Sequence, residues 1–226
     1  GLHEVDVDCI LGGKTKSKTD LKLTLKDKSC LNFSIKKSAG GQVFLIGVER
    51  FISGYEKHYN TIPNNVKEAL RLYFAGHPKI EEILNDKTLV GAEPYTLVSY
   101  QKRKSRLVKV TLEKYDKSLS DALIQWIQSN IVNITDFCLA RGLASNPKEW
   151  SEYLWYKNEV GGRLTEKLYN ISDIKRAVAE KADAVIYGTR MGGSTIQLPF
   201  GFLQWHQGQM QFHHQLKKIL TLVESL

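Results

Sequence analysis

Apolar and polar residues alternate along two short runs near the beginning of the chain, over residues 21–25 and 31–35. Alternation with a period of two is typical of strands that bury one face, and the polar stretch 26–29 between the runs supplies a turn. Similar alternation over 4–11 and 42–46 indicates two more strands, and apolar residues at helical spacing follow directly after the second of them. The opening of the chain therefore predicts strands that lead into a helix.

The middle of the chain has a different pattern. Residues 66–84 show the apolar spacing of helices, whereas for 95–112 we expect strands or extended loops. Ser118 is expected to be the N-cap of a long helix, because apolar residues recur at intervals of three and four from there to Phe137.

The last third returns to strand-like patterns. We expect a strand over 150–160, a helix that Ser172 caps and that runs to about 181, and a short strand over 184–187. Three alternating segments, broken by proline and glycine, are then expected to pair as a small antiparallel sheet: 194–198, 202–206 and 209–213.

The two faces of this small sheet differ in chemistry. Successive side chains of a strand point to opposite faces, so Leu203 and Trp205 lie on one face with Met210 and Phe212. The opposite face carries amides, imidazoles and one aromatic ring: Phe202, Gln204, His206, Gln209, Gln211 and His213. One face is therefore expected to pack against the core while the other offers hydrogen-bonding groups.

Length and composition predict one globular unit. The 226 residues are 42% hydrophobic, and no linker or low-complexity tract divides them. We expect a mixed α/β fold with a mixed central β-sheet flanked by helices, and a single domain over 1–226. Within it we distinguish a core (about 4–60), a helical middle (about 63–142) and a C-terminal β-rich segment (about 184–214).

The charge and the cysteine content limit which class of binding partner and which cellular compartment are expected. The formal charge of +8 favours a polyanion bound through its phosphates, although a generic basic protein would show the same excess. We find neither an apolar run long enough to cross a bilayer nor a signal-peptide pattern. We therefore expect a cytoplasmic protein without a membrane partner. The three cysteines are widely spaced, which favours reduced thiols over disulfides or a zinc site.

An acid and an amine are expected to meet at the first hairpin. Asp20 opens the first alternating run, and the second run brings Lys36 back beside it. A carboxylate can hold a divalent cation and a nearby lysine can polarise a water, which is what phosphodiester hydrolysis requires. A solvent-facing ion pair is the structural alternative for the same two residues.

These residues resemble the PD-(D/E)XK nuclease superfamily, with Lys18-Thr19-Asp20 in the place of PD and Ser34-Ile35-Lys36 in the place of (D/E)XK. Ser34 departs from the usual acid at its position. Further stretches in the same order resemble the type II restriction endonucleases related to MspI and its GCGC-cutting relatives. They include Gln42 to Tyr55, ALRLYFAG, ITDFCLARG, EWSEYLWYK and GSTIQLPFGFLQWHQGQMQF. Those nucleases carry a longer N-terminal helical segment than residues 1–4 provide; if such a segment has been removed, part of the active-site wall is expected to be missing from this sequence.

The resemblance implies a Mg²⁺-dependent enzyme that cuts double-stranded DNA, a type II restriction endonuclease of a restriction–modification system. Asp20 and the main-chain carbonyl of Ile35 would hold the Mg²⁺ ion, and Lys36 would orient or deprotonate the attacking water. Ser34 could hold only a metal-bound water. The missing acid is expected to be Glu49, with Asp6 and Asp8 as alternatives.

DNA contacts are expected from two parts of the chain. The first part would bind phosphates flanking the scissile bond through Lys14, Lys16, Lys18, Lys37 and Ser38. The second part would read base edges, because arginine pairs well with guanine and glutamine with adenine; it comprises Arg190, Gln197, Gln204, His206 and Gln209. Exposed polar residues that keep a sheet soluble are the alternative for this part.

Several assignments stay open at this stage. The cluster Lys102, Arg103, Lys104 and Arg106 is either a solvated loop or a clamp on the DNA backbone. His206, His213 and His214 are more consistent with surface or phosphate contacts than with a metal, because His213 and His214 would lie on opposite faces. The relatives indicate a short GC-rich palindrome, read by a monomer or a homodimer, and no protein partner is evident.

Three other functions fit parts of the pattern. A DNA-binding protein that keeps the nuclease fold but has lost the hydrolytic activity would explain why Ser34 stands where the family usually has an acid. A non-specific or repair nuclease would need the same acid and lysine. An RNA-binding or RNA-processing protein would share the charge and the aromatic content, although A-form grooves present different base edges.

Overall fold

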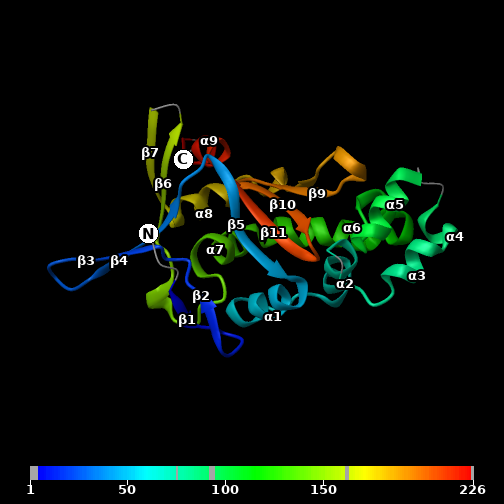
Figure 1. Ribbon diagram of the computed structural model, residues 1–226, viewed down its shortest axis with the longest axis horizontal. Helices are drawn as coiled ribbons and strands as arrows, with labels where there is room; N and C mark the ends of the chain where they lie inside the picture. The colour runs from blue at the N-terminus through cyan, green and yellow to red at the C-terminus, as the bar shows by residue number, and fades with distance from the viewer. Residues whose placement is uncertain (1–4, 75, 92–94, 161–162, 225–226) are drawn as a thin grey trace.

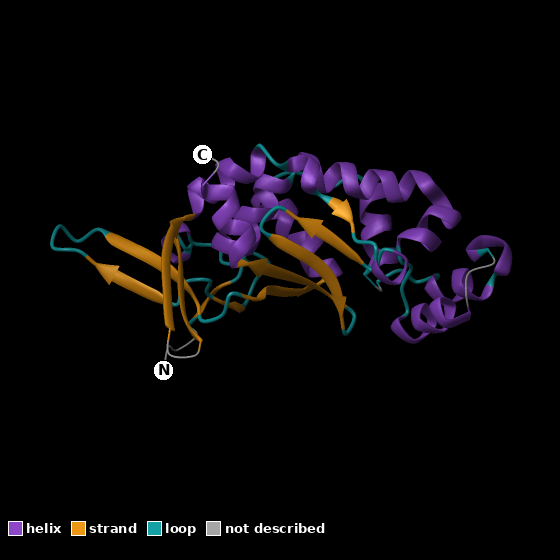
Figure 2. Ribbon diagram, turned by 90° about the horizontal axis from the view of Figure 1, so that it is seen from above, coloured by secondary structure: helices purple, strands orange, loops and turns teal. Residues whose placement is uncertain are grey.

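The computed structural model describes residues 5–74, 76–91, 95–160 and 163–224 of the chain. Strands from the first and last parts of this sequence form three sheets, and helices cover them mainly on one side (Figures 1 and 2). The mixed α/β class predicted from the sequence is confirmed, with the strands divided between a five-stranded sheet, a four-stranded sheet and a short hairpin.

The five-stranded sheet is antiparallel throughout. Its strands, in spatial order, are β5 (Gly40–Gly47), β11 (Gln209–Gln215), β10 (Gly201–His206), β9 (Thr195–Leu198) and β8 (Ile186–Tyr187). The three C-terminal segments pair as predicted. β5 is added at one edge, so that a strand from the first fifth of the chain lies beside one from its end.

The four-stranded sheet has mixed pairing. β3 (Leu21–Thr24) and β4 (Cys30–Lys36) form the predicted hairpin, β4 pairs in parallel with β6 (Tyr153–Val160), and β6 pairs with β7 (Arg163–Asn170). The parallel pair brings the hairpin against a segment more than 110 residues later in the chain. The third sheet consists of β1 (Asp6–Asp8) and β2 (Lys14–Lys16).

The core lies between the five-stranded sheet and the helices. Phe51 and Tyr55 of α1 (Val48–His58) contact Trp126 of α6 (Lys109–Ser129), and Phe51 also contacts Phe212 of β11. Phe137 follows α7 (Ile131–Asp136) and packs on the same rings. The remaining helices are α2 (Asn64–Tyr73), α3 (Ile80–Asn85), α4 (Lys87–Val90), α5 (Tyr95–Lys104), α8 (Ile171–Ala179) and α9 (Leu216–Glu224).

The prediction of strands or loops over 95–112 is wrong, because α5 and the beginning of α6 occupy this segment. Its β-branched and aromatic residues favour strands. Leu97 and Gln101, four residues apart, are nevertheless both buried, as one face of a helix requires. Tertiary packing therefore outweighs local preference here.

Two expected helix caps lie two residues earlier than predicted. Asp116 breaks α6 with φ −158° and ψ 105°, and its carboxylate accepts hydrogen bonds from the Ser118 amide at 2.8 Å and the Ser118 hydroxyl at 2.6 Å. Asn170 accepts from the Ser172 amide at 2.8 Å at the start of α8. In both places an Asx side chain is the acceptor and the serine supplies the donor. The sequence prediction also omitted β7 and α9.

None of the helices in the described part of the chain is both long enough and apolar enough to cross a bilayer.

The contact between β10 and β11 depends on a glycine. A Cβ atom at Gly201 would lie 1.8 Å from the carbonyl oxygen of His213, which is backbone and cannot rotate away. We predict that Gly201→Ala lowers the free energy of unfolding by about 1–3 kcal/mol, as overpacking in a core does. Gly47→Ala is the matched control, since a Cβ atom there meets no atom within 4 Å. Equal urea-unfolding midpoints for the two variants would contradict this account.

Candidate functional site

Asp20 lies at the end of the β3–β4 hairpin, directly before β3. Its backbone amide donates to the carbonyl of Phe33 at 2.8 Å, which continues the strand pairing by one residue. Its Oδ2 atom accepts a hydrogen bond of 2.6 Å from the backbone amide of Ile35. The carboxylate is therefore held against the C-terminal end of β4 by the backbone of that strand.

Ser34 connects the acid to the amine. Lys36 Nζ donates to Ser34 Oγ at 2.9 Å, and Ser34 Oγ lies 3.4 Å from Asp20 Oδ2. A hydroxyl can accept one hydrogen bond and donate another, so the three side chains form a chain that runs from Lys36 through Ser34 to Asp20. Ser34 is only 2% exposed. The sequence prediction that Asp20 and Lys36 converge is thus met by this geometry, with Ser34 between them.

A cavity of about 570 Å³ opens at these residues, between the hairpin and β5. Asp20, Ser34 and Lys36 line it on one side, and Gln42, Arg50 and Gln209 contribute from the five-stranded sheet and α1. Two other cavities, of about 730 and 630 Å³, are larger, but Asp20, Ser34 and Lys36 do not line them. The site therefore lies where the two large sheets meet.

Two lysines in this cavity are held in surroundings that disfavour their charge. Burial lowers the pKa of Lys36, and the Asp20 carboxylate only partly opposes this effect. Burial, with the positive charge of Lys36 nearby, lowers the pKa of Lys18 to about 7. Lys18 Nζ donates to the carbonyl of Val43 at 2.7 Å and lies 3.7 Å from the centroid of the Phe44 ring. Lys18, predicted as a phosphate contact, is thus part of the cavity itself.

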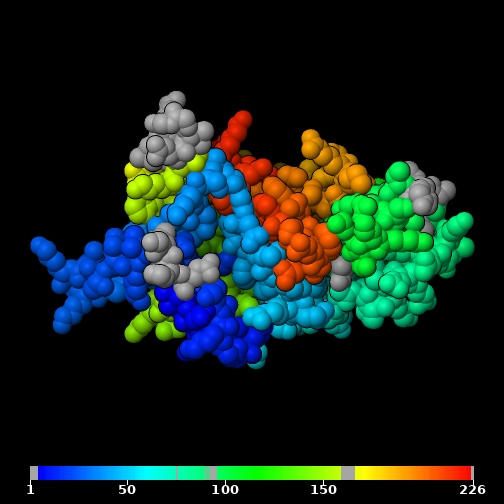
Figure 3. Space-filling view, viewed as in Figure 1, coloured from blue at the N-terminus to red at the C-terminus, as the bar shows by residue number. Residues whose placement is uncertain are grey.

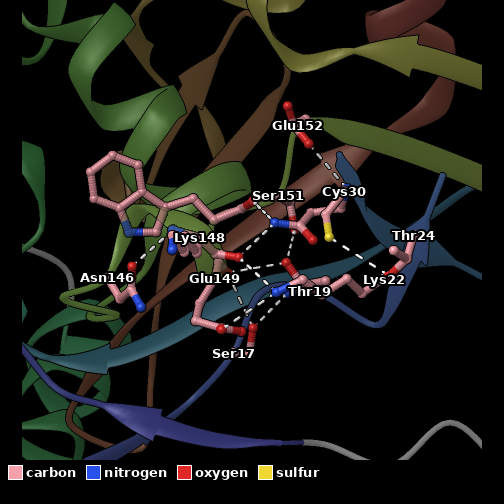
Figure 4. Close-up of polar contacts among 12 residues, drawn as sticks. Ser17, Thr19, Lys22, Thr24, Cys30, Asn146, Lys148, Glu149, Ser151 and Glu152 are labelled. Carbon is pink, nitrogen blue, oxygen red and sulfur yellow. Dashed lines mark hydrogen bonds and ion pairs between the residues drawn. The ribbon is translucent and has the colours of Figure 1, made fainter. Parts of the chain in front are cut away.

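A loop after α7 braces the residues around Asp20 (Figure 4). Thr19 Oγ1 donates to the carbonyl of Glu149 at 3.1 Å, and Ser17 Oγ donates to the same carbonyl at 3.3 Å. On β4, Asn32 Nδ2 donates to the carbonyls of Lys148 and Trp150, each at 2.9 Å. These contacts fix the segment before β3 and the strand β4 to one loop, so the acid cannot move relative to β4 without breaking them.

The structure does not bring a second acid into the cavity among the residues it describes. Glu49, expected to be the missing acid, forms a two-point ion pair with Arg71 on α2, at 2.7 and 2.9 Å, and does not line the cavity. The alternatives Asp6 and Asp8 pair with Lys16 at 3.0 Å and Lys14 at 2.6 Å across the β1–β2 hairpin. The described chain also contains no group of three or more His, Cys, Asp or Glu side chains that could hold a metal.

A divalent ion with few protein ligands fits the groups that are present. The Ile35 amide points at Asp20, and the amide and carbonyl of one residue in an extended strand point to the same side. The Ile35 carbonyl is therefore directed toward the carboxylate. Mg²⁺ takes oxygen ligands, keeps several waters and often uses only one or two carboxylates. Asp20 and the Ile35 carbonyl match that requirement, whereas softer metals would need nitrogen or sulfur ligands.

The predicted phosphate contacts are dispersed. Lys14 and Lys16 are exposed but engaged by the aspartates of β1. Lys37 and Ser38 are exposed directly after β4, where Ser38 Oγ donates to the carbonyl of Gly40 at 2.9 Å. Of the five, Lys16 and Lys18 line the cavity together with Asp20.

The polar face of the C-terminal strands extends onto β5. Gln204 Nε2 donates to Gln211 Oε1 at 2.7 Å, and Gln211 Nε2 donates to Gln42 Oε1 at 2.6 Å. This row of amides crosses three strands, and its last member lines the cavity that contains Asp20. Leu203, Met210 and Phe212 are buried on the opposite face, as predicted. Sequence reasoning placed Gln42 and Arg50 in a strand and the helix after it but did not single them out as site residues, because only the tertiary fold, in which β5 pairs with β11, brings them to the cavity.

The other expected base contacts lie around this row. His206 and Gln209 are register partners at the tip of the β10–β11 hairpin, and Gln209 also lines the cavity. Gln197 on β9 instead accepts a hydrogen bond of 3.2 Å from Lys218. Arg190 is exposed in a short 3-10 turn, Arg190–Gly192, before β9. Of the expected base contacts, Gln204, His206 and Gln209 therefore lie together on the β10–β11 hairpin.

The histidines separate as predicted. His213 stacks on Phe202 with ring centroids 4.4 Å apart, while His214 points to the other side of β11 and lies 2.6 Å from the hydroxyl of Tyr156. Burial, together with the positive charge of Lys36, lowers the pKa of His214 to about 4. A neutral imidazole therefore lies near Lys36 and links the two large sheets.

The second basic cluster is not a uniform loop. Arg106 is buried, with its guanidinium 4.6 Å from the centroid of the Tyr73 ring and its Nη2 atom donating to the Ser194 carbonyl at 3.0 Å. Lys104 lies 4.6 Å from the centroid of the Trp205 ring. Lys102 and Arg103 are exposed. Inclusion of Arg106 among solvent or DNA-contacting residues was wrong, because it holds the α5–α6 connection to the β9 region.

Comparison with known proteins gives a limited result. No family model matches the sequence, and no curated protein matches it. Among solved structures, the chain is similar to the restriction endonuclease MspI in a crystal structure with its cognate DNA, at 14% sequence identity and a TM-score of 0.49. The match covers 87% of this chain and 63% of that chain, so this chain spans less than two thirds of that enzyme's length.

The depressed pKa of Lys18 generates a prediction about stability. Lys18 titrates near 7 in the folded protein and near 10.5 in the unfolded chain. Between those values the unfolded chain binds more protons, so stability rises with pH, by up to about 1.4 kcal/mol per pH unit for one proton. We predict that Lys18→Met raises the free energy of unfolding relative to the wild type most at or below pH 7. The difference should shrink as the pH rises toward 10.5.

Urea unfolding at several pH values measures this difference. Lys16→Met is the control for the loss of one positive charge, since its side chain is exposed on β2. It should leave the pH dependence as in the wild type. A difference between Lys18→Met and the wild type that stays constant with pH would show that the folded protein does not hold Lys18 in a charge-disfavouring site.

Proposed function

We propose that this protein is a sequence-specific endonuclease that hydrolyses phosphodiester bonds of double-stranded DNA with Mg²⁺, as a type II restriction enzyme does. The observation that carries the proposal is the chain from Lys36 through Ser34 to Asp20. It lies in a cavity whose opposite wall continues into a row of hydrogen-bonding amides. An acid, an amine of lowered pKa and a polar surface that suits a DNA groove are thus adjacent.

Asp20 and the Ile35 carbonyl would hold the Mg²⁺ ion. When bound there, the ion would neutralise negative charge that develops on the phosphate and supply a polarised water. Ser34 fixes the Asp20 carboxylate through one oxygen, as does the Ile35 amide. The other oxygen of Asp20 therefore remains for the cation.

Lys36 is the group proposed to handle the proton of the attacking water. A lysine acts as a base only in its neutral form, and the burial that lowers its pKa raises the fraction of that form near neutral pH. Ser34 holds the Lys36 amine 2.9 Å away, which orients it beside Asp20. Lys18, in its charged form, would bind a phosphate oxygen in the same cavity.

DNA recognition is proposed for the polar face. Glutamine amides can pair with adenine and arginine with guanine in the major groove. Gln204 and Arg190 remain the preferred base contacts, with Gln211 and Gln42 added because they continue the row toward the cavity. A short GC-rich palindrome is the expected site.

The absence of a second acid from the described part of the cavity favours one other candidate function. A DNA-binding protein that retains the nuclease fold would keep the polar face and would tolerate Ser34 where an acid is usual. Such a protein would shift duplex DNA on a gel without cutting it in Mg²⁺.

Plasmid digestion in Mg²⁺ tests the proposal. We predict that the wild type gives discrete fragments, and that Asp20→Asn and Lys36→Met each slow cleavage at least ~100-fold, since each removes a group required in the transition state. Both variants should still bind duplex DNA in Ca²⁺. Asp183→Asn and Lys181→Met are matched controls on the exposed surface after α8, and they should cut at the wild-type rate.

The possible digests separate the candidate functions. Smeared products would indicate a non-specific or repair nuclease, and intact DNA with a gel shift would indicate the DNA-binding protein. A preference for RNA in competition would contradict both. Normal cleavage by either site variant would exclude Asp20 and Lys36 as the catalytic pair.

A further inference from the structure

Two rows of side chains cross the polar face of the five-stranded sheet. The strand register places Gln197, Phe202, His213 and Gln42 in one row, and Thr195, Gln204, Gln211 and Leu45 in the next. The strands that carry these rows lie at the surface of the molecule, with β10 and β11 in orange and β5 in light blue in Figure 3. None of the residues in the two rows is a lysine, an arginine or an acid, and burial lowers the pKa of the His213 imidazole. The rows are therefore uncharged.

Gln42 keeps hydrogen-bonding groups available for a ligand. Its Oε1 atom accepts 2.6 Å from Gln211 Nε2, and an amide oxygen has a second lone pair. Its Nε2 atom donates to no residue in the described part of the chain. In Gln204, by contrast, Nε2 already lies 2.7 Å from Gln211 Oε1 and 3.2 Å from His213 Nε2. Gln42 is exposed, so its amide can offer a donor and an acceptor at once.

Phe202 is the aromatic ring of these rows. It stacks on the His213 imidazole, with centroids 4.4 Å apart and an interplanar angle of 8°. The ring is half-buried, but it belongs neither to the hydrophobic core nor to the partly buried side chains packed against the core. Because the stacking already holds the ring in one orientation, an apolar contact with it costs little conformational entropy.

Gln42 and Phe202 can enter the same DNA groove. They stand on β5 and β10, and His213 on β11 lies between them in the row. Two strand spacings amount to about 10 Å, which is within the ~12 Å width of the major groove of B-DNA.

The chemistry of these two side chains matches an A·T base pair. Adenine presents an N7 acceptor and an N6 amino donor, which one glutamine amide can bind at two points, and thymine presents a C5-methyl group to apolar side chains. Guanine presents two acceptors and is most often read by arginine or lysine, which are absent from the two rows. Arg190 lies outside the rows, in the turn before β9, and remains available for guanine.

We propose that the recognition sequence includes A·T base pairs, with Gln42 bound to an adenine and Phe202 in contact with the C5-methyl group of a thymine. The assignment rests on the proposed function, because duplex DNA must lie across the polar face. The recognition sequence is then not built of G·C pairs alone, although it can contain them through Arg190. Since Gln42 lines the same cavity as Asp20, the adenine would lie near the cleaved bond.

Selection of bound duplexes from a random library in Ca²⁺ identifies the sequence that the wild-type protein prefers. Binding is the readout, so the result does not depend on whether the protein cuts. We expect A·T pairs at fixed positions. A selected sequence of G·C pairs alone overturns the inference and leaves the proposed DNA recognition standing. A library from which no sequence is enriched contradicts sequence-specific recognition itself, and the inference with it.

Base analogues in the selected duplex test the two contacts. Deoxyuridine in place of thymine removes one methyl group, which should lower the wild-type affinity about 4-fold. 7-Deazaadenine in place of adenine removes the N7 acceptor and should lower the affinity at least ~5-fold. Phe202→Ala should bind the thymine and deoxyuridine duplexes equally, and Gln42→Ala should bind the adenine and 7-deazaadenine duplexes equally. Each comparison uses two duplexes on one protein, so a loss of folded protein in a variant cancels.

Tyr153→Ala is the matched control, because Tyr153 is a half-buried ring stacked on Phe33 in the other large sheet. It should keep the wild-type preference for thymine. Equal binding of the thymine and deoxyuridine duplexes by the wild type overturns the Phe202 contact, as does a preference that persists in Phe202→Ala. The corresponding results with 7-deazaadenine and Gln42→Ala overturn the adenine contact.

Discussion

The hydrogen bond from the Ile35 amide to the Asp20 carboxylate is the interaction on which the site depends. It joins the residue before β3 to the C-terminal end of β4, and the loop that contains Glu149 holds the same two segments. Because β4 also pairs in parallel with β6, the acid is fixed to three parts of the chain that are distant in sequence. The contact between His214 and Tyr156 then ties this sheet to the five-stranded one, near Lys36.

Ser34 changes the electrostatics of this arrangement. A carboxylate at its position would add a negative charge that could stabilise both a cation and a charged Lys36. With a hydroxyl there, Lys36 faces one acid only, and burial lowers its pKa. Lys18 experiences the same shortage of negative charge, with a pKa of about 7. Of the two amines, Lys18 can therefore gain or lose a proton near neutral pH, and a bound phosphate would favour the charged forms of both.

The local part of this structure could be predicted from the sequence, and the long-range part could not. Alternation specifies the β3–β4 hairpin and the C-terminal strands, so Asp20, Lys36 and the two faces of β10 and β11 were found. The amide row was missed because Gln42 meets Gln211 across 169 residues. Glu49 looked like a free acid near the site, but Arg71 on another helix binds it. Arg106 looked like a surface cation, and only packing against Tyr73 shows that it is buried.

The cleavage rate of Ser34→Ala under single-turnover conditions tests the central claim most directly, since this change removes the hydroxyl that links Lys36 to Asp20 and leaves both groups in place. The geometry predicts a rate at least ~10-fold below that of the wild type with unchanged affinity for duplex DNA in Ca²⁺. A variant that cuts as fast as the wild type would show that the acid and the amine do not act through this chain of contacts.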